Sequence, residues 1–166
     1  MILRPAGTAD LPRLAPMWRA AWLDGHAGHV PAELMDARGP GHFTVHATRY
    51  AGSTTVATDD GGRLLGMIIL GPAEGEVVQL AVDGSARGQG VGGALLRSAE
   101  ERFAGEHEEA WLAVVPGNAR ARRFYEFHGW RDTGAMTYAA PTSGGGTVPV
   151  PVLRYAKPLG ALAVAR

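Results

Sequence analysis

The residues best suited to chemistry lie in a glycine-rich stretch near the middle of the chain. Residues 82–96 read VDGSARGQGVGGALL, with four closely spaced glycines between an expected strand and an expected helix. The N–H groups of a first helical turn have no partner in the chain and carry partial positive charge. Because glycine has no Cβ, a bulky anion can approach them closely. The stretch therefore predicts a pyrophosphate cradle, with the charge of Arg87 at its mouth.

Three kinds of ligand fit such a loop. A nucleotide-binding P-loop requires a lysine directly after its last glycine, and none is present here. The dinucleotide pattern GxGxxG is present at Gly88, Gly90 and Gly93, but five residues separate Gly88 from the expected strand end at Val82. That pattern normally turns directly off its strand. The hypothesis of a nicotinamide-dependent oxidoreductase is therefore supported by the glycine spacing alone. The third ligand is coenzyme A.

Composition narrows the functional classes. Among 166 residues, 16 Lys and Arg balance 16 Asp and Glu, which argues against a nucleic-acid partner. The absence of cysteine excludes disulfides and thiolate catalysis. The beginning of the chain has no apolar run typical of a signal peptide, and no stretch resembles a membrane span. We expect a cytoplasmic protein without a membrane partner, with one domain over residues 1–160 and a tail over residues 161–166.

The first third of the chain predicts two helices. Apolar residues at helical spacing predict a helix from residue 8 or 10 to residue 21 or 24, and Pro16 is expected to kink or break it. Residues 31–38 predict a second, short helix. We interpret Gly39-Pro40-Gly41 as a turn.

Strands and helices alternate after residue 53. Apolar and β-branched segments predict strands over residues 54–58, 63–70, 76–82 and 111–115. Helical spacing predicts helices over residues 91–103 and 118–128, and a terminal hairpin is expected between residues 130–139 and 148–156. This order predicts a mixed sheet in an α/β or α+β fold.

The second of these helices has clear boundary signals. Asn118 is a good N-cap, and Gly129 suits the left-handed position after the last turn. The expected inner face of this helix consists of Ala121, Phe124, Phe127 and His128.

Two motifs in this order resemble the GNAT superfamily of N-acetyltransferases. The first is Arg87-Gly88-Gln89-Gly90-Val91-Gly92, preceded by the strand end Leu80-Ala81-Val82. It departs from the family in having Gly84-Ser85 where a proline often follows the strand. The second comprises Leu112-Ala113-Val114, Asn118, Ala121, Phe124-Tyr125 and Gly129-Trp130. The resemblance extends from Leu3 to about Leu159. It implies a central, mixed, mostly antiparallel twisted sheet of about seven strands flanked by about four helices.

The resemblance also implies acetyl-CoA as co-substrate, bound without a metal. The family holds the pantetheine arm between two splayed strands, a role that would belong to Leu80, Ala81 and Val82. The pyrophosphate would bind the backbone of Arg87, Gly88, Gln89, Gly90, Val91, Gly92 and Gly93. Asn118 would bind the cofactor near its thiol. One of Arg120, Arg122 and Arg123, with Arg123 chosen here, would contact its phosphates.

The implied reaction is direct transfer of an acetyl group to an amine within a ternary complex. The amine must lose a proton, and the departing thiolate, with a pKa near 8.5, leaves better when protonated. Tyr125 matches the family's general acid. Glu76 matches the position of a catalytic glutamate in some members, and a water chain is the alternative base. From the residues alone, Tyr125 could be a core aromatic, Glu76 a solvated acid and Asn118 only a cap.

Two histidine pairs, His26 with His29 and His42 with His46, have a spacing loosely like that of metal ligands. Because no cysteine or HExxH motif accompanies them, no metal site is expected. Instead Trp22, His26 and His29 lie where the family places its acceptor pocket. The alternative is that the tryptophan belongs to the core and both histidines to a loop.

We therefore expect an acetyl-CoA-dependent N-acetyltransferase acting on a primary amine of a small molecule or protein. The alternative is a non-catalytic acyl-CoA-binding module that acts as a sensor or interaction partner. Because members of the family often pair terminal strands across a dimer, the resemblance allows a homodimer.

Overall fold

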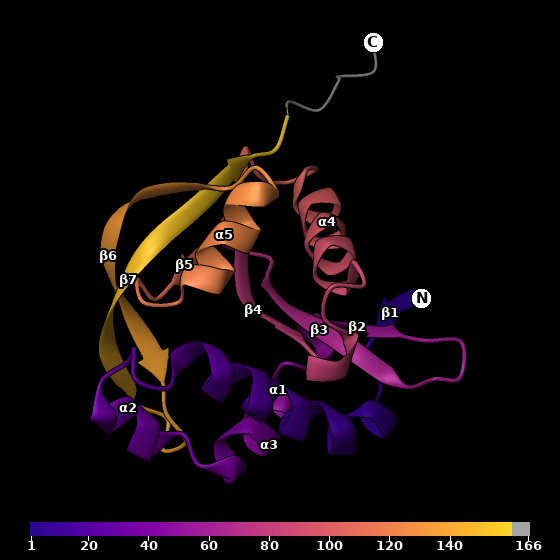
Figure 1. Ribbon diagram of the computed structural model, residues 1–166, viewed down its shortest axis with the longest axis horizontal. Coiled ribbons are helices and arrows are strands. Elements are labelled where there is room, and N and C mark those ends of the chain that lie inside the picture. The colour runs from indigo at the N-terminus through magenta and orange to yellow at the C-terminus, as the bar shows by residue number, and fades with distance from the viewer. Residues whose placement is uncertain (161–166) are drawn as a thin grey trace.

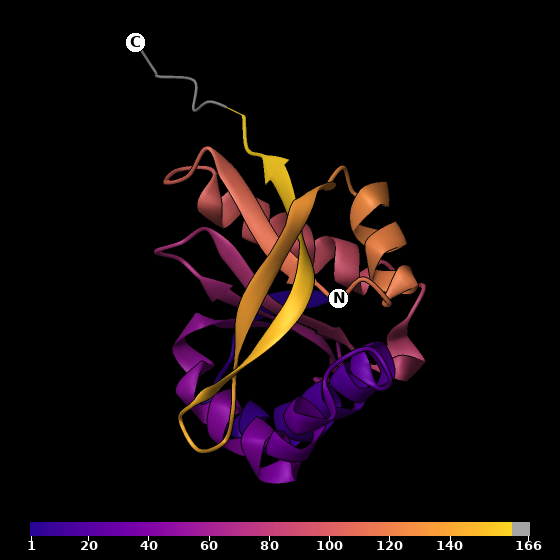
Figure 2. The same cartoon turned by 90° about the vertical axis from the view of Figure 1, so that its left-hand side faces the viewer.

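A twisted sheet separates two groups of helices (Figures 1 and 2). The computed structural model describes residues 1–160, so the expected tail over residues 161–166 lies outside the described residues. The strands are β1 (Ile2–Pro5), β2 (Thr54–Thr58), β3 (Leu64–Gly71), β4 (Glu76–Val82), β5 (Glu109–Val114), β6 (Arg131–Pro141) and β7 (Thr147–Pro158). Their order is β1-β2-β3-β4-β5-β7-β6. β4 and β5 run parallel and the other neighbours are antiparallel, which confirms the predicted sheet.

Helices cover both faces of the sheet. They are α1 (Leu11–His26), α2 (Ala32–Ala37), α3 (Pro40–Arg49), α4 (Val91–Phe103) and α5 (Ala119–Phe127). Figure 1 shows α1, α2 and α3 on one side of the sheet and α4 and α5 on the other. Among residues 1–160, no helix has both the length and the apolarity that crossing a membrane would require.

Helix α1 continues through Pro16, so the expected break at this residue is wrong. A proline removes one backbone hydrogen bond from a helix. The inner face of α1 buries Leu14, Met17, Trp18 and Trp22 against the sheet. Burial of side chains of this size contributes several kcal/mol in total, about the cost of one interior proline or more.

The segment interpreted as a turn at Gly39-Pro40-Gly41 instead begins a helix. Pro40 occupies the first turn of α3, where its missing N–H would have no partner in any case. Phe43 and Ala47 then pack into the core beneath α1. The protein therefore has one helix more than the sequence predicts on this face.

Helix α5 presents a slightly different inner face from the predicted one. Asn118 caps it as expected, accepting a hydrogen bond from the N–H of Ala121 at 3.1 Å. Phe127, however, is 85% exposed, so its predicted place on the inner face is wrong. At about 100° per residue, Phe127 lies roughly 240° around the helix from Ala121, whereas Tyr125 lies nearer the buried face.

The sheet has a separate apolar core on each face. β3 contributes to both, because its side chains alternate from Met67 to Ile69: Met67 and Ile69 pack beneath α1–α3, and Ile68 packs against α4. The register with β2 skips Leu65, which lies on the same face as Ile68. Burial on both faces explains why the apolar run of the strand predicted over residues 63–70 is continuous.

The feature that positions the site is the separation of β4 from β5. The register between these parallel strands consists of one pair, Glu76 with Trp111. The pairing of β4 with β3 also skips a residue, because Ile69 faces Gln79 while Leu70 faces Val77. The extra residue, Val78, forms a β-bulge, a feature that increases the local twist of a strand. Beyond Glu76, β4 and β5 therefore diverge.

Close packing of α4 onto the sheet depends on Gly66 of β3. A Cβ at this position would lie 2.9 Å from the carbonyl oxygen of Ala81 and 3.0 Å from a methyl group of Val91. Since Ala81 belongs to β4 and Val91 begins α4, Gly66 sets the distance between the strand and the helix that together border the site.

We expect Gly66→Ala to lower the free energy of unfolding by about 1–3 kcal/mol, because the added methyl group overpacks this contact. Gly84→Ala is the matched control, since nothing lies within 4 Å of its added Cβ, and it should change stability by less than about 0.5 kcal/mol. Urea denaturation followed by circular dichroism measures both. Equal stability of the two variants would contradict this account of the packing.

Candidate active site

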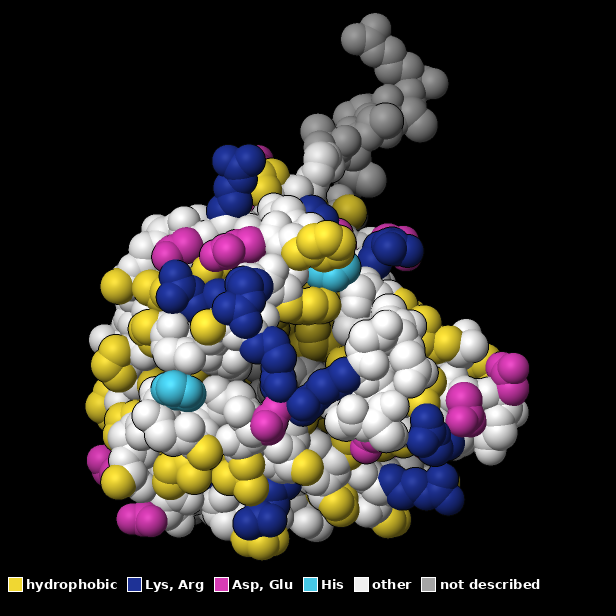
Figure 3. Space-filling view, viewed as in Figure 1, with side chains coloured by type: hydrophobic (Ala, Val, Ile, Leu, Met, Phe, Trp, Pro, Cys, Tyr) yellow, Lys and Arg dark blue, Asp and Glu magenta, His cyan; other side chains and the backbone are white. Residues whose placement is uncertain are grey.

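A cavity of about 480 Å³ opens where β4 and β5 diverge. Its walls are β4, the first turn of α4, β5 and α5, together with the last part of α1. Figure 3 shows the hollow on this face of the molecule, with Lys and Arg side chains and an acidic side chain at its rim. Leu80, Ala81 and Val82, to which the family resemblance assigns the pantetheine arm, line it from β4.

The glycine-rich turn leads from β4 into α4 along one wall of this cavity. Gly88 and Gly90 have φ values of +73° and +79°, which favour glycine. Gly90 is the N-cap residue of α4, so the N–H groups that follow it open towards the cavity without helical acceptors. This geometry suits a phosphate group. Arg87, Val91 and Gly92 also line the cavity, whereas Gln89 does not and donates to the carbonyl of Ser85.

Gly93, the last glycine of the turn, also permits a close helix contact that the sequence does not predict. A Cβ at Gly93 would lie 2.8 Å from the Cε1 atom of His128, which follows α5. Gly92 has a similar close neighbour in the ring of Phe124. The glycines therefore also allow α4 and α5 to pack closely, and only the tertiary structure reveals this contact.

The cavity mouth carries two arginines that share one carboxylate. Arg87 and Arg120 both donate to Asp24 of α1, at 2.8 and 2.6 Å. These ion pairs are exposed, so each contributes little to stability. Arg120 lines the cavity, whereas Arg123 is exposed and does not. The structure therefore brings a different arginine of α5 to the mouth from the one chosen on sequence.

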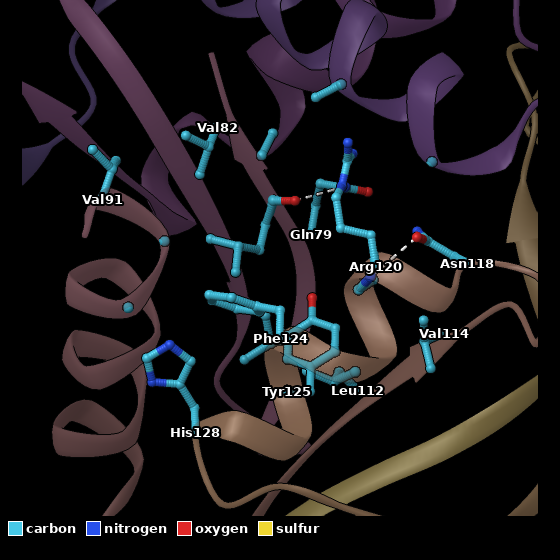
Figure 4. Close-up of a pocket in the computed structure, with 18 of the residues that line it drawn as sticks. Gln79, Val82, Val91, Leu112, Val114, Asn118, Arg120, Phe124, Tyr125 and His128 are labelled. Atoms are coloured by element: carbon cyan, nitrogen blue, oxygen red, sulfur yellow. Dashed lines mark hydrogen bonds between the residues drawn. The ribbon is translucent and has the colours of Figure 1, made fainter. Parts of the chain in front are cut away.

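Tyr125 lies at the base of the cavity. Its side chain is 9% exposed, and burial raises the pKa of its phenol, which keeps the hydroxyl protonated. Figure 4 shows this hydroxyl pointing towards β4, on the side of Gln79. Asn118 lies on the same wall and approaches α1 closely, since a Cβ at Gly25 would be 2.8 Å from its Nδ2 atom.

A second cavity, of about 100 Å³, lies under α1, α2 and α3. Trp22 and Glu76 line it, whereas neither lines the first cavity. The two cavities share four residues, which are His26, Val78, Gln79 and Ala113. Since three of these belong to β4 and β5, the cavities meet at the gap between the strands. His29 is exposed and lines neither cavity.

Glu76 is the carboxylate of the second cavity. The hydroxyl of Tyr138, on β6, donates to its Oε1 at 2.6 Å. Burial raises the pKa of Glu76 above its ordinary value, Tyr138 opposes this effect, and the charge of Glu74 adds to it. A carboxyl group with a raised pKa is suited to accepting a proton near neutral pH. The role of Tyr138 has no signal in the sequence, because it depends on the register of a distant hairpin.

His26 lies at the junction of the two cavities. Its Nδ1 atom is 2.8 Å from the carbonyl of Trp22, and its ring stacks on that indole at 4.9 Å. Because a carbonyl only accepts, Nδ1 carries the proton and Nε2 keeps its lone pair. Burial lowers the pKa of His26 to about 4, so the ring is neutral at pH 7.

The arrangement can bring two molecules together from opposite faces of the sheet. A glycine-rich turn suited to an anion and a protonated phenol border one cavity, and a carboxylate borders the other. The two cavities share lining residues at the strand gap. Within residues 1–160, no group of three or more histidine or acidic side chains is placed to hold a metal ion.

Comparisons with solved structures show the same fold in known acetyltransferases. A GCN5-related N-acetyltransferase from Rhodopseudomonas palustris matches with a TM-score of 0.71 and 21% identity, over 95% of each chain. One from Kribbella flavida matches with a TM-score of 0.67 and 25% identity, over 95% of this chain and 97% of the other. A phosphinothricin acetyltransferase from Sinorhizobium meliloti, in complex with AcCoA, matches with a TM-score of 0.68 and 18% identity, over 98% and 91%.

No curated protein matches the sequence. The model of the acetyltransferase (GNAT) family, however, matches residues 14–130, which is most of the chain. This range includes both motifs and all the walls that β4, β5, α4 and α5 contribute to the first cavity. The chain therefore belongs to the GNAT family of acetyl-CoA-dependent N-acetyltransferases.

Proposed function

We propose that this protein transfers an acetyl group from acetyl-CoA to a primary amine while both are bound, one on each side of the gap between β4 and β5. The observation that carries the proposal is that two cavities with complementary chemistry meet at this gap. Direct transfer requires the two reacting groups to be held within about 3–3.5 Å of each other. A connected pair of cavities supports such an arrangement.

The first cavity fits acetyl-CoA. Beyond Glu76, the edge of β4 that faces β5 has no strand partner within the described residues, so its backbone groups are available to the amide groups of the pantetheine arm. The N–H groups at the start of α4 would hold the pyrophosphate, and Arg120 would contribute positive charge at the mouth. The thioester of acetyl-CoA supplies the activated acetyl group.

Tyr125 and Glu76 provide the two proton transfers that the reaction needs. Glu76 accepts a proton from the amine, so that a neutral nitrogen attacks the thioester carbon. A backbone N–H of β4 near Ala81 stabilises the negative charge that develops on the thioester oxygen. Tyr125 donates its proton to the sulfur as the carbon–sulfur bond breaks, and the attacking nitrogen gives up a proton that restores the phenol, which yields the amide and free CoA. Trp22 and His26 then belong to the acceptor side.

Binding of acetyl-CoA is the first test. Isothermal calorimetry should detect binding by the wild-type protein, and Arg120→Gln should weaken it by about 3- to 10-fold through the loss of one phosphate contact. Arg123→Gln is the matched control on the same helix and should change the Kd by less than about twofold. Binding without transfer to any amine would support a sensor instead, and no binding at millimolar acetyl-CoA would end the proposal.

Tyr125→Phe should lower kcat by about 10- to 100-fold, because the leaving thiolate loses its proton donor. Stopped assays of acetyl transfer, together with calorimetry, separate this effect from binding, since the Kd for acetyl-CoA should stay within about twofold. Tyr155→Phe removes another phenol, which donates to Glu126 at 2.7 Å outside the cavities. Tyr155→Phe should reduce stability and leave kcat unchanged. If the two variants had equal kcat values, Tyr125 would not be the general acid.

Glu76→Gln should lower kcat by about 100-fold or more, because the variant side chain cannot accept the proton. In the wild type, kcat should fall as the pH drops through the pKa of Glu76, which burial raises above the ordinary value of 4.5. This acid limb should be absent from the residual activity of Glu76→Gln. Glu74→Gln, at a neighbouring exposed carboxylate, should keep the limb and shift it to lower pH. If Glu76→Gln kept the kcat of the wild type, a chain of water molecules would be the base instead.

A further inference from the structure

Arg38 extends into the second cavity from the end of α2 and is held there from two sides. Its Nε atom donates to the carbonyl of Pro141, at the end of β6, at 3.0 Å. Its guanidinium lies over the ring of Trp22, with 5.1 Å between Cζ and the ring centroid. The hydroxyl of Ser143 donates to the carbonyl of Ala37 at 3.0 Å and fastens the same segment. Figure 2 shows the β6–β7 loop beside these helices.

The charge of Arg38 has no counterion within residues 1–160. Among the described residues, no carboxylate lies within ion-pair distance of it, whereas Arg87 and Arg120 at the other cavity both have Asp24. Burial lowers the pKa of Arg38 to about 10, so the side chain stays positive at pH 7. The two terminal nitrogens of its guanidinium group can donate two parallel hydrogen bonds to one carboxylate. A half-buried cation of this kind is costly unless an anion joins it.

Two neutral histidines lie in the wall of the same cavity. His42 and His46 are each 2% exposed, and their rings stack with centroids 4.0 Å apart. The Nδ1 atom of His42 and the Nε2 atom of His46 are buried and find no hydrogen-bond partner among the described residues. Burial lowers the pKa of both rings, which are therefore uncharged at pH 7.

The cavity thus carries opposite charges on different walls. Glu76 is its carboxylate and lies at the strand gap, while Arg38 is its guanidinium and comes from the opposite layer of helices. The remaining lining is mostly aromatic and aliphatic. The volume of about 100 Å³ is well below the ~300–1,000 Å³ typical of drug-sized ligands, so the occupant must be small.

We propose that the second cavity binds a small amino acid, with its amine at Glu76 beside the strand gap and its carboxylate on Arg38. The inference rests on the proposed function, because it identifies the acceptor of the same reaction. His42 and His46 line the cavity near Arg38 without adding charge. A peptide N-terminus fits less well, since the carboxyl group of its first residue is an uncharged amide and leaves Arg38 unpaired.

The test compares acids with their amides. Glycine, L-alanine, L-serine, L-valine and L-methionine are each assayed beside the corresponding primary amide, which keeps the amine and removes the anion. Release of free CoA from acetyl-CoA measures transfer. In parallel, the thermal shift of the CoA-loaded protein measures binding without chemistry. We expect at least one acid to exceed its amide by about 10- to 100-fold in kcat/KM, the range for a lost charge-assisted hydrogen bond.

Arg38→Gln should abolish this preference. The KM for the preferred acid should rise by about 10- to 100-fold, while the KM for its amide and the Kd for acetyl-CoA stay within about twofold. Compared with Arg38→Gln, Arg38→Lys should restore part of the affinity for the acid, because lysine returns the positive charge but not the planar pair of N–H donors. Arg97→Gln, at an exposed arginine of α4 outside both cavities, is the control and should behave as the wild type.

The outcomes separate this inference from the proposed function. Amides used as well as or better than acids would overturn the amino-acid assignment and favour a peptide N-terminus, while leaving acetyl transfer intact. An acid-specific thermal shift that Arg38→Gln abolishes would support the anion site even if no amine were acetylated. The absence of both an acid-specific shift and an acid preference in transfer would overturn it.

Discussion

The site depends on one break in an otherwise regular sheet. β4 and β5 are parallel neighbours that pair only where Glu76 faces Trp111, and the bulge at Val78 turns β4 away beyond that point. In a continuous sheet, the backbone groups of β4 would be used by β5. The divergence leaves them free within the described residues, and the two cavities share lining residues of β4 and β5 at this point.

The two faces contribute different chemistry for a physical reason. On one side, the start of α4 offers backbone N–H groups and α5 offers the buried phenol of Tyr125, which suit a large phosphorylated carrier and its leaving sulfur. On the other side, α1, α2 and α3 bring side chains of several types around a small space. Hydrogen bonds from backbone N–H groups to a ligand depend little on which side chains are present. Recognition by the second cavity depends on its side chains. The matched family range, residues 14–130, ends before most of the hairpin that supplies Tyr138.

The packing that keeps the strands apart is distributed over both cores. Gly66 allows α4 to approach β3 and β4, and Gly93 allows α5 to approach α4. Trp130 donates to Glu100 at 2.9 Å, and Lys157 donates to the same carboxylate at 2.8 Å, which joins α4 to the chain after α5 and to β7. The walls of the first cavity are thus fixed to the sheet and to each other, so its shape is present before any ligand binds.

The sequence alone determined the features that are local in the chain. Six of the seven strands, the N-cap at Asn118 and the turn at Gly90 follow from spacing and residue type, because neighbouring residues decide turns, caps and periodicity. The family follows from the resemblance of two motifs. The assigned roles of Tyr125 and Glu76 remain predictions, as do the homodimer and the cytoplasmic location. Errors arose where packing overruled a local signal, as at Pro16 and at Pro40.

Only the tertiary structure decided which distant residues meet. It brought Arg120 rather than Arg123 to the cavity mouth and placed Tyr138 on Glu76. It also put Arg38 into the second cavity, with no counterion among residues 1–160. No pattern in the chain predicts these pairings, since they join segments that are far apart in sequence. They depend on strand register and helix packing, and a shift of one residue in either would turn these side chains to another face.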